Sequence, residues 1–435
     1  MLSRTLSLLC FAASFASAAP LHVQQAGFQA AADGLPAGWH TWAARPEIAP
    51  RTFVDSVHYR HAPGSLAISG NSNAAEYGGW EYAAPGVQAG KWYRFVAYYR
   101  ADGLQDERRQ VVSRLDWKKS DGNRAGHPDY VYASERAGEW TRVWIEAPAP
   151  EESAAVTLQL YLQNAPYSTL WWDEISFEEV PAPPKRLVRV ASINLRPRGT
   201  HSAQESVGQF VDVIEKSVAA GTDVILLPEG ITVVGTGKRY PDVAETIPGP
   251  TTERLAQVAR AKKAYIVAGI FEREGAAIYN TAVLIDRAGK LLGKYRKVYL
   301  PREEIEGGLT PGNDYPVFRT DFGKVGMMIC WDLQYADPAR ALALRGAEMI
   351  LMPIWGGNET LGKARAIENQ VFLVSSGYDY PTYIMDPDGE LLAIAREQGT
   401  VAVATIDLNR RYVESWLGDM RERFMKELRL DVKLE

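Results

Sequence analysis

Residues 223–230 read Asp-Val-Ile-Leu-Leu-Pro-Glu-Gly, an apolar run that passes directly into Pro228, Glu229 and Gly230. A continuous apolar run of strand length is typical of a parallel strand that is covered on both faces. The stretch therefore predicts a buried strand with a glutamate at its carboxyl end, where open α/β sheets gather their chemistry. Other apolar strand-length runs lie at 187–193, 264–270, 279–285 and 349–353.

Helices are expected between these runs. Five apolar residues share one helical face, and Gly221 behind them is well placed to end the helix. These five are Val207, Phe210, Val211, Ile214 and Val218. Further helical pieces are expected near 252–262, 338–345 and 361–370. Alternating strands and helices indicate a layered α/β domain over residues 186–435, which is large enough for a substantial core.

Residues 21–180 show a different pattern. Aromatic and β-branched residues alternate roughly with polar ones at 91–100, 140–145 and 156–162, and Gly, Pro, Asp and Asn clusters separate these stretches. Many short strands with turns between them predict an all-β sandwich. The chain is therefore expected to hold two domains, joined by a proline-rich linker at residues 181–185.

Residues 1–18 predict a secretory signal peptide. They combine a positively charged start, a short apolar core and a small-residue cleavage site, Ala-Ser-Ala, at 16–18. We therefore expect an exported protein, periplasmic or secreted. Cys10 would leave with the peptide, so that Cys330 would be the single thiol of the mature chain in an oxidising compartment.

Composition excludes several classes of function. The chain has 435 residues and a formal net charge of -5, so no basic excess argues for nucleic acid or an anionic membrane surface. Two cysteines are too few for a disulfide scaffold or a cysteine-based zinc site. The six histidines lie outside the motifs that follow and give no sign of a metal centre.

Glu229, Lys297 and Cys330 are the candidate catalytic residues. Each alone has an ordinary explanation, because strand-end glutamates are often solvated, lysines are mostly exposed and buried cysteines fill space. Together and in this order they resemble the nitrilase superfamily of carbon–nitrogen hydrolases, whose signature is a Glu, a Lys and a Cys. The likeness spans the second half of the chain and includes further segments: Tyr-Arg-Lys-Val-Tyr-Leu at 295–300, Gly-Leu-Thr-Pro-Gly at 308–312, Phe-Gly-Lys-Val-Gly at 322–326, Cys-Trp-Asp at 330–332 and Arg-Ala-Ile-Glu-Asn-Gln at 365–370.

The resemblance implies an αββα sandwich, a homodimer, a small-molecule amide or nitrile as substrate, and no metal or organic cofactor. A thiolate at Cys330 would attack the substrate carbon, and Glu229 would take the thiol proton, hand it to the leaving amine and later activate water. Protonated Lys297 and the backbone N–H of Trp331 would stabilise the charge on the substrate oxygen. The charge of Lys297 is also expected to favour the thiolate.

The family also uses a second glutamate beside the lysine. Glu303, Glu304 and Glu306 are the candidates, and their spacing from the turn at Pro311 leaves both Glu304 and Glu306 open. We favour Glu304, with Glu306 as the alternative. The remaining acidic residues would then form a solvated loop.

Two departures from the family pattern bear on the substrate. Residues 335–337 read Tyr-Ala-Asp where the family commonly has Phe-Pro-Glu, so the family pattern does not predict the entrance of the pocket. Asp337 and Pro338 are expected to cap and to begin the next helix. The nitrile-hydrolysing branch usually has Cys-Trp-Glu, whereas this chain has Cys-Trp-Asp at 330–332, so amides are favoured over nitriles.

Four residues are candidates for lining the pocket, although aromatic packing explains them equally well: Trp355, Asn358, Tyr378 and Tyr380.

The first half resembles jelly-roll carbohydrate-binding or galactose-binding-like modules, through loose likenesses at 63–68, 90–94 and 170–175. Exposed aromatic rings can stack on sugars, so contact with a glycan or cell wall is one expectation and a docking or structural role is the other. Three functions stay open for the whole chain: an exported amide hydrolase, a nitrilase, and a glycan-binding protein with an inactive hydrolase fold. The complete set of three candidate residues speaks against the third, and the Cys-Trp-Asp segment favours the first over the second.

Overall fold

The computed structural model describes residues 22–378, 382–414 and 417–432. The expected signal peptide at residues 1–18 and the candidate pocket residue Tyr380 lie outside these ranges. Within them, no helix is long and apolar enough to cross a membrane.

Contacts between Cα atoms divide the chain into two compact units, residues 1–182 with 431–435, and residues 183–430. Of the described residues, Asp431 and Val432 fall with the first unit. Within that unit Asp431 lies 3.8 Å from Arg109, close enough for an ion pair between carboxylate and guanidinium.

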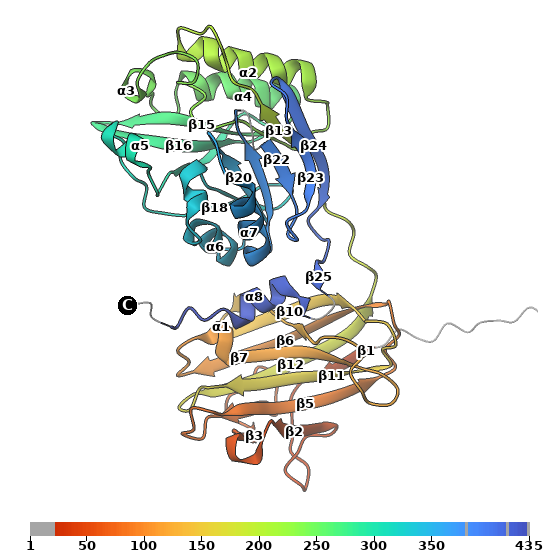
Figure 1. The fold of residues 1–435 in the computed structure, drawn as a ribbon. Coiled ribbons are helices and arrows are strands. Elements are labelled where there is room, and N and C mark those ends of the chain that lie inside the picture. Colours follow the sequence, from red (N-terminus) through yellow and green to blue (C-terminus); the bar gives the residue numbers. More distant parts are fainter. Residues whose placement is uncertain (1–21, 379–381, 415–416, 433–435) are drawn as a thin grey trace, which may run out of the picture. The chain divides into compact units, whose positions relative to one another are not determined.

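The first unit consists of two antiparallel sheets (Figure 1). The larger sheet has the order β3-β4-β12-β6-β10-β9, with β1 paired to β12, and the smaller has the order β2-β5-β11-β7-β8. The larger sheet contains β1 (His22–Gln25), β3 (Arg51–Asp55), β4 (Ser65–Ser69), β6 (Trp92–Asp102), β9 (Ala133–Ala137), β10 (Trp140–Pro148) and β12 (Thr169–Val180). The smaller contains β2 (Trp39–Ala43), β5 (Tyr77–Pro85), β7 (Val111–Lys118), β8 (Asp129–Tyr130) and β11 (Ala155–Gln163). Two short helices accompany them, η1 (Pro46–Ile48) and α1 (Glu107–Gln110).

Alternating side chains explain why this half forms sheets. Along β6, buried residues alternate with half-buried ones, as expected of a strand with one face in a core. Both sheets contribute to a single apolar cluster that contains Trp80, Trp117 and Trp172, all fully buried. The expected β structure of this half is confirmed, and packing explains much of its tryptophan.

The second unit contains two six-stranded sheets of similar plan. In each sheet three neighbouring strands run parallel and the outer strands run antiparallel. The first sheet has the order β17-β16-β15-β14-β13-β24 and the second β18-β19-β20-β21-β22-β23. The first contains β13 (Leu187–Asn194), β14 (Val224–Leu226), β15 (Tyr265–Glu274), β16 (Ala277–Ile285), β17 (Leu291–Arg296) and β24 (Thr400–Asp407). The second contains β18 (Val317–Arg319), β19 (Lys324–Met327), β20 (Met349–Pro353), β21 (Phe372–Ser376), β22 (Thr382–Met385) and β23 (Leu391–Ala395).

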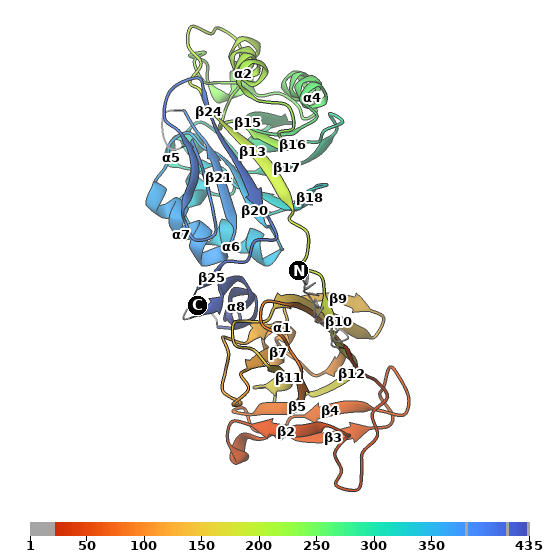
Figure 2. The ribbon, with the colours of Figure 1, turned by 90° about the vertical axis from the view of Figure 1, so that its right-hand side faces the viewer.

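Helices pack on both sheets of this unit (Figures 1 and 2). Val207 and Phe210 of α2 and Leu255 of α4 share an apolar cluster with the first sheet. Leu342 of α6 and Ala366 of α7 join a cluster that includes strands of the second sheet. The helical elements are α2 (Ala203–Ser217), α3 (Tyr240–Val243), α4 (Pro250–Lys262), α5 (Arg302–Glu306), η2 (Cys330–Gln334), α6 (Asp337–Leu344), α7 (Glu359–Asn369) and α8 (Met420–Glu427). A two-stranded ribbon, β25 (Val413–Glu414) and β26 (Gly418–Asp419), precedes α8.

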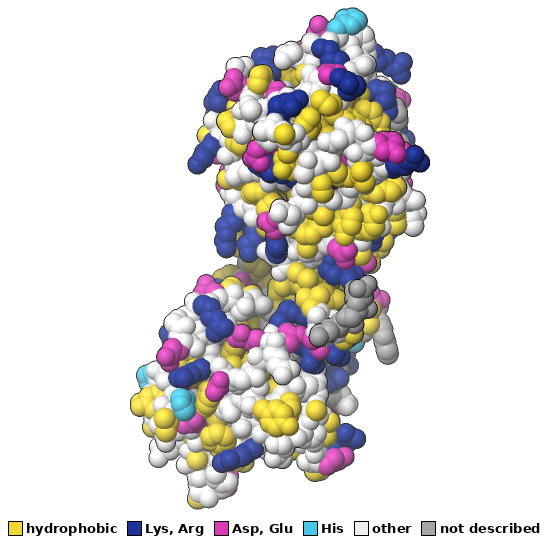
Figure 3. All heavy atoms as spheres, turned by 90° about the vertical axis from the view of Figure 1, so that its left-hand side faces the viewer, with side chains coloured by type: hydrophobic (Ala, Val, Ile, Leu, Met, Phe, Trp, Pro, Cys, Tyr) yellow, Lys and Arg dark blue, Asp and Glu magenta, His cyan; other side chains and the backbone are white. Residues whose placement is uncertain are grey.

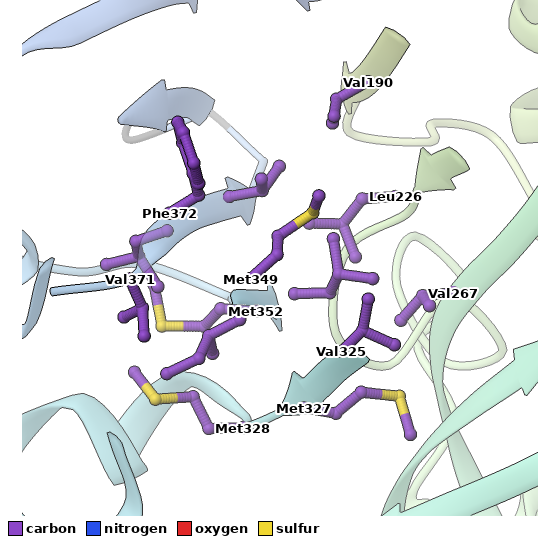
Figure 4. Close-up of a cluster of buried hydrophobic side chains, with 14 of the residues drawn as sticks. Val190, Leu226, Val267, Val325, Met327, Met328, Met349, Met352, Val371 and Phe372 are labelled. Atoms are coloured by element: carbon purple, nitrogen blue, oxygen red, sulfur yellow. The ribbon is translucent and has the colours of Figure 1, made fainter. Parts of the chain in front are cut away.

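The two sheets of the second unit share one core. Leu226 and Val267 come from the first sheet, and Val325, Met327 and Met349 come from the second (Figure 4). Several methionines fill this space, as suits an unbranched side chain that adapts to irregular gaps. The shared core fixes the strand ends from which the site is built.

The strands and helices expected in this half are present, with ends shifted by a few residues. The helix expected at 338–345 runs from Asp337 to Leu344, and its N-cap is Ala336 rather than Asp337. The Asp337 carboxylate instead accepts a hydrogen bond from Tyr299 Oη at 3.0 Å. A side-chain partner outside the helix has therefore replaced the expected cap.

Candidate active site

Glu229 lies in the loop after β14, and β15 holds that loop in place. The N–H of Leu227 donates to Val267 O at 2.8 Å, and the N–H of Gly269 donates to Pro228 O at 3.0 Å. Gly269 is required at this point, because a Cβ there would lie 2.6 Å from the Cα of Glu229. Because the two segments approach closely, the position of the buried Glu229 side chain is fixed.

Lys297 follows β17 directly and is only 1% exposed. Its N–H donates to Asn280 O at 2.8 Å. Its Nζ lies 2.8 Å from Glu229 Oε1 and 2.9 Å from Glu304 Oε1. Burial alone would lower the pKa of Lys297, but the negative charges of Glu229 and Glu304 outweigh this effect and raise the pKa. The lysine is therefore a buried cation.

The structure brings Glu304, and neither Glu303 nor Glu306, to Lys297. Glu304 is buried on α5, whereas Glu303 and Glu306 are exposed. The Glu306 carboxylate pairs with Arg302 at 2.7 Å instead. Burial raises the pKa of Glu304 to about 7, with Lys297 opposing the shift and Glu229 adding to it. Near neutral pH this carboxyl is therefore part protonated.

Asn280 is a site residue that sequence reasoning missed. It lies fully buried on β16, and its Nδ2 donates to Glu229 Oε1 at 2.7 Å and to Glu304 Oε1 at 2.8 Å. One signal was available, since an amide interrupts the apolar run at 279–285. A buried polar side chain needs a hydrogen-bond partner.

Cys330 begins η2, directly after Met328 and Ile329 at the end of β19. Its φ of 41° lies in the left-handed region, which costs a residue with a side chain about 1–3 kcal/mol. Its Sγ lies 3.5 Å from Gly356 O. Such a bend at a strand end is typical of a residue whose side chain must project into a site.

The Cys330 thiol is protonated at rest. Burial raises its pKa to about 12 and the charge of Glu229 adds to the shift, while Lys297 and backbone N–H groups of Trp355 and Gly356 oppose it. Lys297 therefore favours the thiolate as expected, but burial and Glu229 prevail. Any attack by this sulfur requires a base that removes the proton.

Asp332 ties the Cys330 turn to the segment around Lys297. Its Oδ2 accepts hydrogen bonds from Tyr295 Oη at 2.7 Å and from the N–H of Ile329 at 2.9 Å. Its Oδ1 accepts from the N–H of Tyr299 at 3.0 Å. Burial raises the pKa of Asp332 to about 6, although these hydrogen bonds favour the charged form.

The backbone N–H of Trp331 precedes the first internal bond of η2. That bond runs from the N–H of Asp332 to Ile329 O at 3.0 Å. The N–H of Trp331 therefore has no acceptor inside its own helix, like the other early N–H groups of a helix.

Of the four candidate pocket residues, the structure leaves two near the site. Trp355 and Tyr378 pack edge to face with ring centroids 4.7 Å apart, and Arg196 lies over both rings. Tyr378 Oη donates to the backbone carbonyl of Glu229. Asn358 instead caps α7, because its side chain accepts from the N–H of Thr360 at 2.8 Å.

The described ranges contain no group of three or more His, Cys, Asp and Glu side chains placed to hold a metal ion.

The second half of the chain is similar to known proteins. Residues 189–416 match the carbon-nitrogen hydrolase family. The omega-amidase NIT2 of Xenopus tropicalis is 30% identical over 249 residues, which cover 50% of this chain and 87% of that protein. The omega-amidase NIT2 of Homo sapiens is 29% identical over 251 residues, which cover 51% of this chain and 89% of that protein.

Two solved structures were also matched to this chain. Nit3 of Saccharomyces cerevisiae, a member of the nitrilase superfamily, is 22% identical with a TM-score of 0.46, and the match covers 52% of this chain and 93% of that one. An amidase from Nesterenkonia sp. is 23% identical with a TM-score of 0.45, covering 53% of this chain and 95% of that one.

Asp332→Asn should weaken the pH dependence of stability in the second unit. Because burial raises the pKa of Asp332 from 3.8 to about 6, its contribution to stability is full below about pH 4 and is lost as the pH rises through about 6. The free energy of unfolding of the wild type, relative to Asp332→Asn, should therefore fall between about pH 4 and 7. Urea denaturation at several pH values measures it.

Asp337→Asn is the matched control, because it removes an exposed carboxylate that also accepts a tyrosine hydroxyl. A difference between wild type and Asp332→Asn that stays constant with pH would contradict the assignment.

Proposed function

The chain belongs to the carbon-nitrogen hydrolase family and is an amidase-like enzyme, and on this premise we propose that it hydrolyses an amide through a thioester on Cys330. The products would be a carboxylic acid and ammonia or an amine. The observation that carries the proposal is the buried group of Lys297, Glu229 and Glu304, in which the charges of Glu229 and Lys297 act on the Cys330 thiol.

The first step needs a base, and Glu229 supplies one. Its Oε1 is held by Lys297 and Asn280, while its Oε2 has no hydrogen-bond partner among the described residues. As the Sγ of Cys330 bonds to the carbonyl carbon, Oε2 takes the thiol proton and the carbonyl electron pair moves to oxygen. Lys297 and the N–H of Trp331 stabilise the resulting oxyanion.

The following steps return the proton. The tetrahedral intermediate collapses, the C–N bond breaks, and Glu229 delivers its proton to the leaving nitrogen, which leaves a thioester on Cys330. Glu229 then removes a proton from water, the water oxygen bonds to the thioester carbon, and the C–S bond breaks. The sulfur regains its proton, so that the free enzyme is restored.

Glu304 supports this cycle from the other side of Lys297. It shares Lys297 and Asn280 with Glu229, and its Oε2 likewise has no hydrogen-bond partner among the described residues. That oxygen is available to orient the leaving nitrogen or the attacking water. We therefore assign Glu304, rather than Glu306, as the second glutamate.

Amides are proposed over nitriles because of Asp332. Three hydrogen bonds fit a carboxylate of this length. A glutamate, which the nitrile-hydrolysing branch usually has at this position, is one methylene longer and would have to displace Tyr295 or the Cys330 turn. Nitrile hydrolysis is the alternative, since it would use the same sulfur, base and lysine. An inactive hydrolase fold is disfavoured by the retention of every charged partner.

Cys330→Ala should abolish release of ammonia from a panel of simple primary amides, by at least about 1000-fold, because it removes the covalent route. Glu304→Gln should lower the rate, whereas Glu306→Gln on the same helix should not, because Glu306 is exposed and paired with Arg302. Mass spectrometry should find an acyl adduct on the wild-type thiol. An active Cys330→Ala enzyme would end the mechanism.

We further propose that the protein is exported after loss of residues 1–18. The support is the three-part pattern of that segment. When the full chain is expressed in a bacterial host, the intact mass of the protein outside the cytoplasm should lack these residues. Recovery of the uncleaved chain in the cytoplasm alone would refute export.

The second unit is proposed to be an αββα sandwich that pairs into a homodimer. The layers are supported by α2 and α4 packing on one sheet and α6 and α7 on the other. Pairing is supported by exposed apolar side chains, Tyr335 and Ile367 among them. Hydrophobic side chains adjoin one another on the face of this unit drawn in Figure 3.

The first unit is proposed to be a jelly roll that contacts a glycan or cell wall through its smaller sheet. Five side chains stand directly opposite one another across the five strands of that sheet, on the face away from the core: His40, Glu81, Gln159, Arg114 and Tyr130. Beside this polar row, Trp42 stacks on Tyr161 at 5.2 Å and is 38% exposed. An exposed ring next to polar groups suits a sugar.

Trp42→Ala should weaken retention on insoluble polysaccharide or cell-wall material about tenfold, because it removes the stacking surface. Tyr167→Ala, which removes an 83% exposed ring elsewhere in this unit, should not. A pull-down series measures both. Equal behaviour of the two variants, or no retention of the wild type, would assign this unit a docking or structural role.

A further inference from the structure

The proposed steps give Asn280 no part, although it contacts the same oxygens as Lys297. Asn280 Nδ2 lies 2.7 Å from Glu229 Oε1 and 2.8 Å from Glu304 Oε1. Lys297 Nζ lies 2.8 and 2.9 Å from those two atoms. Two donors and two acceptors therefore close a ring of four hydrogen bonds.

The orientation of the Asn280 amide is dictated by its neighbours. With Nδ2 toward the carboxylates, both glutamates receive a hydrogen bond, and Oδ1 has no partner among the described residues. The reverse orientation would set Oδ1 against two carboxylate oxygens, where only acceptors meet. The site therefore uses Asn280 as a neutral double donor that adds no charge beside Lys297.

The ring distinguishes the two oxygens of each carboxylate. A terminal carboxylate rotates easily, because its last torsion is broad and roughly two-fold. Here Oε1 of both glutamates is engaged, and Oε2 of both is without a partner among the described residues. A lysine ammonium alone can follow either oxygen as the group rotates, whereas the planar amide on the opposite side of the ring cannot.

We propose that Asn280 is a positioning residue, which fixes Oε1 of Glu229 and Glu304 so that their Oε2 atoms take and deliver the protons at Cys330. This inference rests on the proposed function of Glu229 as the base. Asn280 touches neither the sulfur nor the reacting carbon, and it acts through the two carboxylates.

The side-chain role of Asn280 is separable from its backbone role. Its carbonyl oxygen accepts from the N–H of Lys297 at 2.8 Å, and its backbone pairs with Phe271 of β15. A substitution of the side chain leaves both of these contacts in place. Loss of activity in a folded variant would therefore report on the carboxylates rather than on the position of Lys297.

Removal of the amide should also change the pH profile. Hydrogen bonds to a carboxylate favour its charged form, so Glu304 should take up a proton at higher pH without Asn280. Other titratable groups face the glutamate pair from several elements and are unchanged by the substitution. They are Lys297 after β17, Cys330 and Asp332 on η2, Tyr240 on α3 and Tyr378 after β21.

The test compares Asn280→Ala and Asn280→Ser with Asn369→Ala. Asn369 is an equally buried amide whose Oδ1 also lacks a partner among the described residues, but its Nδ2 donates to a backbone carbonyl, Arg365 O, at 2.9 Å. The measurements are kcat and KM against pH with a primary amide, and the rate of Cys330 alkylation by iodoacetamide against pH. Thermal unfolding reports on folding.

Both Asn280 variants should lose about 10- to 100-fold in kcat, as expected for lost hydrogen bonds to charged groups, with KM changed less than about threefold. The acid limb of their profiles should move up by about one pH unit. Asn369→Ala should keep the wild-type profile even where it lowers the unfolding temperature.

A folded Asn280→Ala enzyme with the wild-type profile would overturn the proposal. So would an equal shift in Asn369→Ala, or failure of both Asn280 variants to fold when Asn369→Ala folds, because each outcome makes the role structural. If the wild type releases no ammonia from any amide, the proposed function fails. The pH profile of Cys330 alkylation still tests the role of Asn280 in that case, because alkylation needs no turnover.

Discussion

The second unit depends on a single charge taken out of water, the ammonium of Lys297. An isolated buried cation is strongly unfavourable, and its pairing with Glu229 and Glu304 offsets this only while both partners keep good geometry. Each partner comes from a different element: the loop after β14, the end of β17 and helix α5. Removal of the lysine would leave two buried carboxylates without a counter-charge, so the arrangement of these segments is tightly constrained.

The second sheet contributes the sulfur under a different constraint. The positive φ at Cys330 turns the chain sharply after β19, and Asp332 holds that turn against Tyr295 and Tyr299 of the segment that carries Lys297. The two halves of the chemistry are thus joined by one buried carboxylate. The base and the nucleophile are held close to each other by the hydrogen bonds of Asp332, in which neither of their own side chains takes part.

Sequence patterns were sufficient for the parts of this site that depend on strand order. Glu229 and Cys330 each lie shortly after a buried strand that has a parallel neighbour, and the two strands, β14 and β19, belong to different sheets. Each residue could therefore be recognised from its own segment as lying at a strand end. Spacing could not decide between Glu304 and Glu306, because the choice depends on which face of α5 turns inward. Asn280 was missed because an amide inside an apolar strand looks like an interruption until its neighbours are known. The capping role of Asn358 could not be recognised, because a helix cap has the same composition as a polar pocket lining.

The raised pKa of Cys330 has a consequence for the chemical durability of the protein. Peroxides oxidise a thiolate to sulfenic acid far more readily than they oxidise a thiol. A sulfur whose pKa is raised to about 12 carries almost no thiolate between turnovers. The resting enzyme is thereby shielded from oxidative inactivation, and the sulfur becomes vulnerable only in the brief interval when its proton has moved.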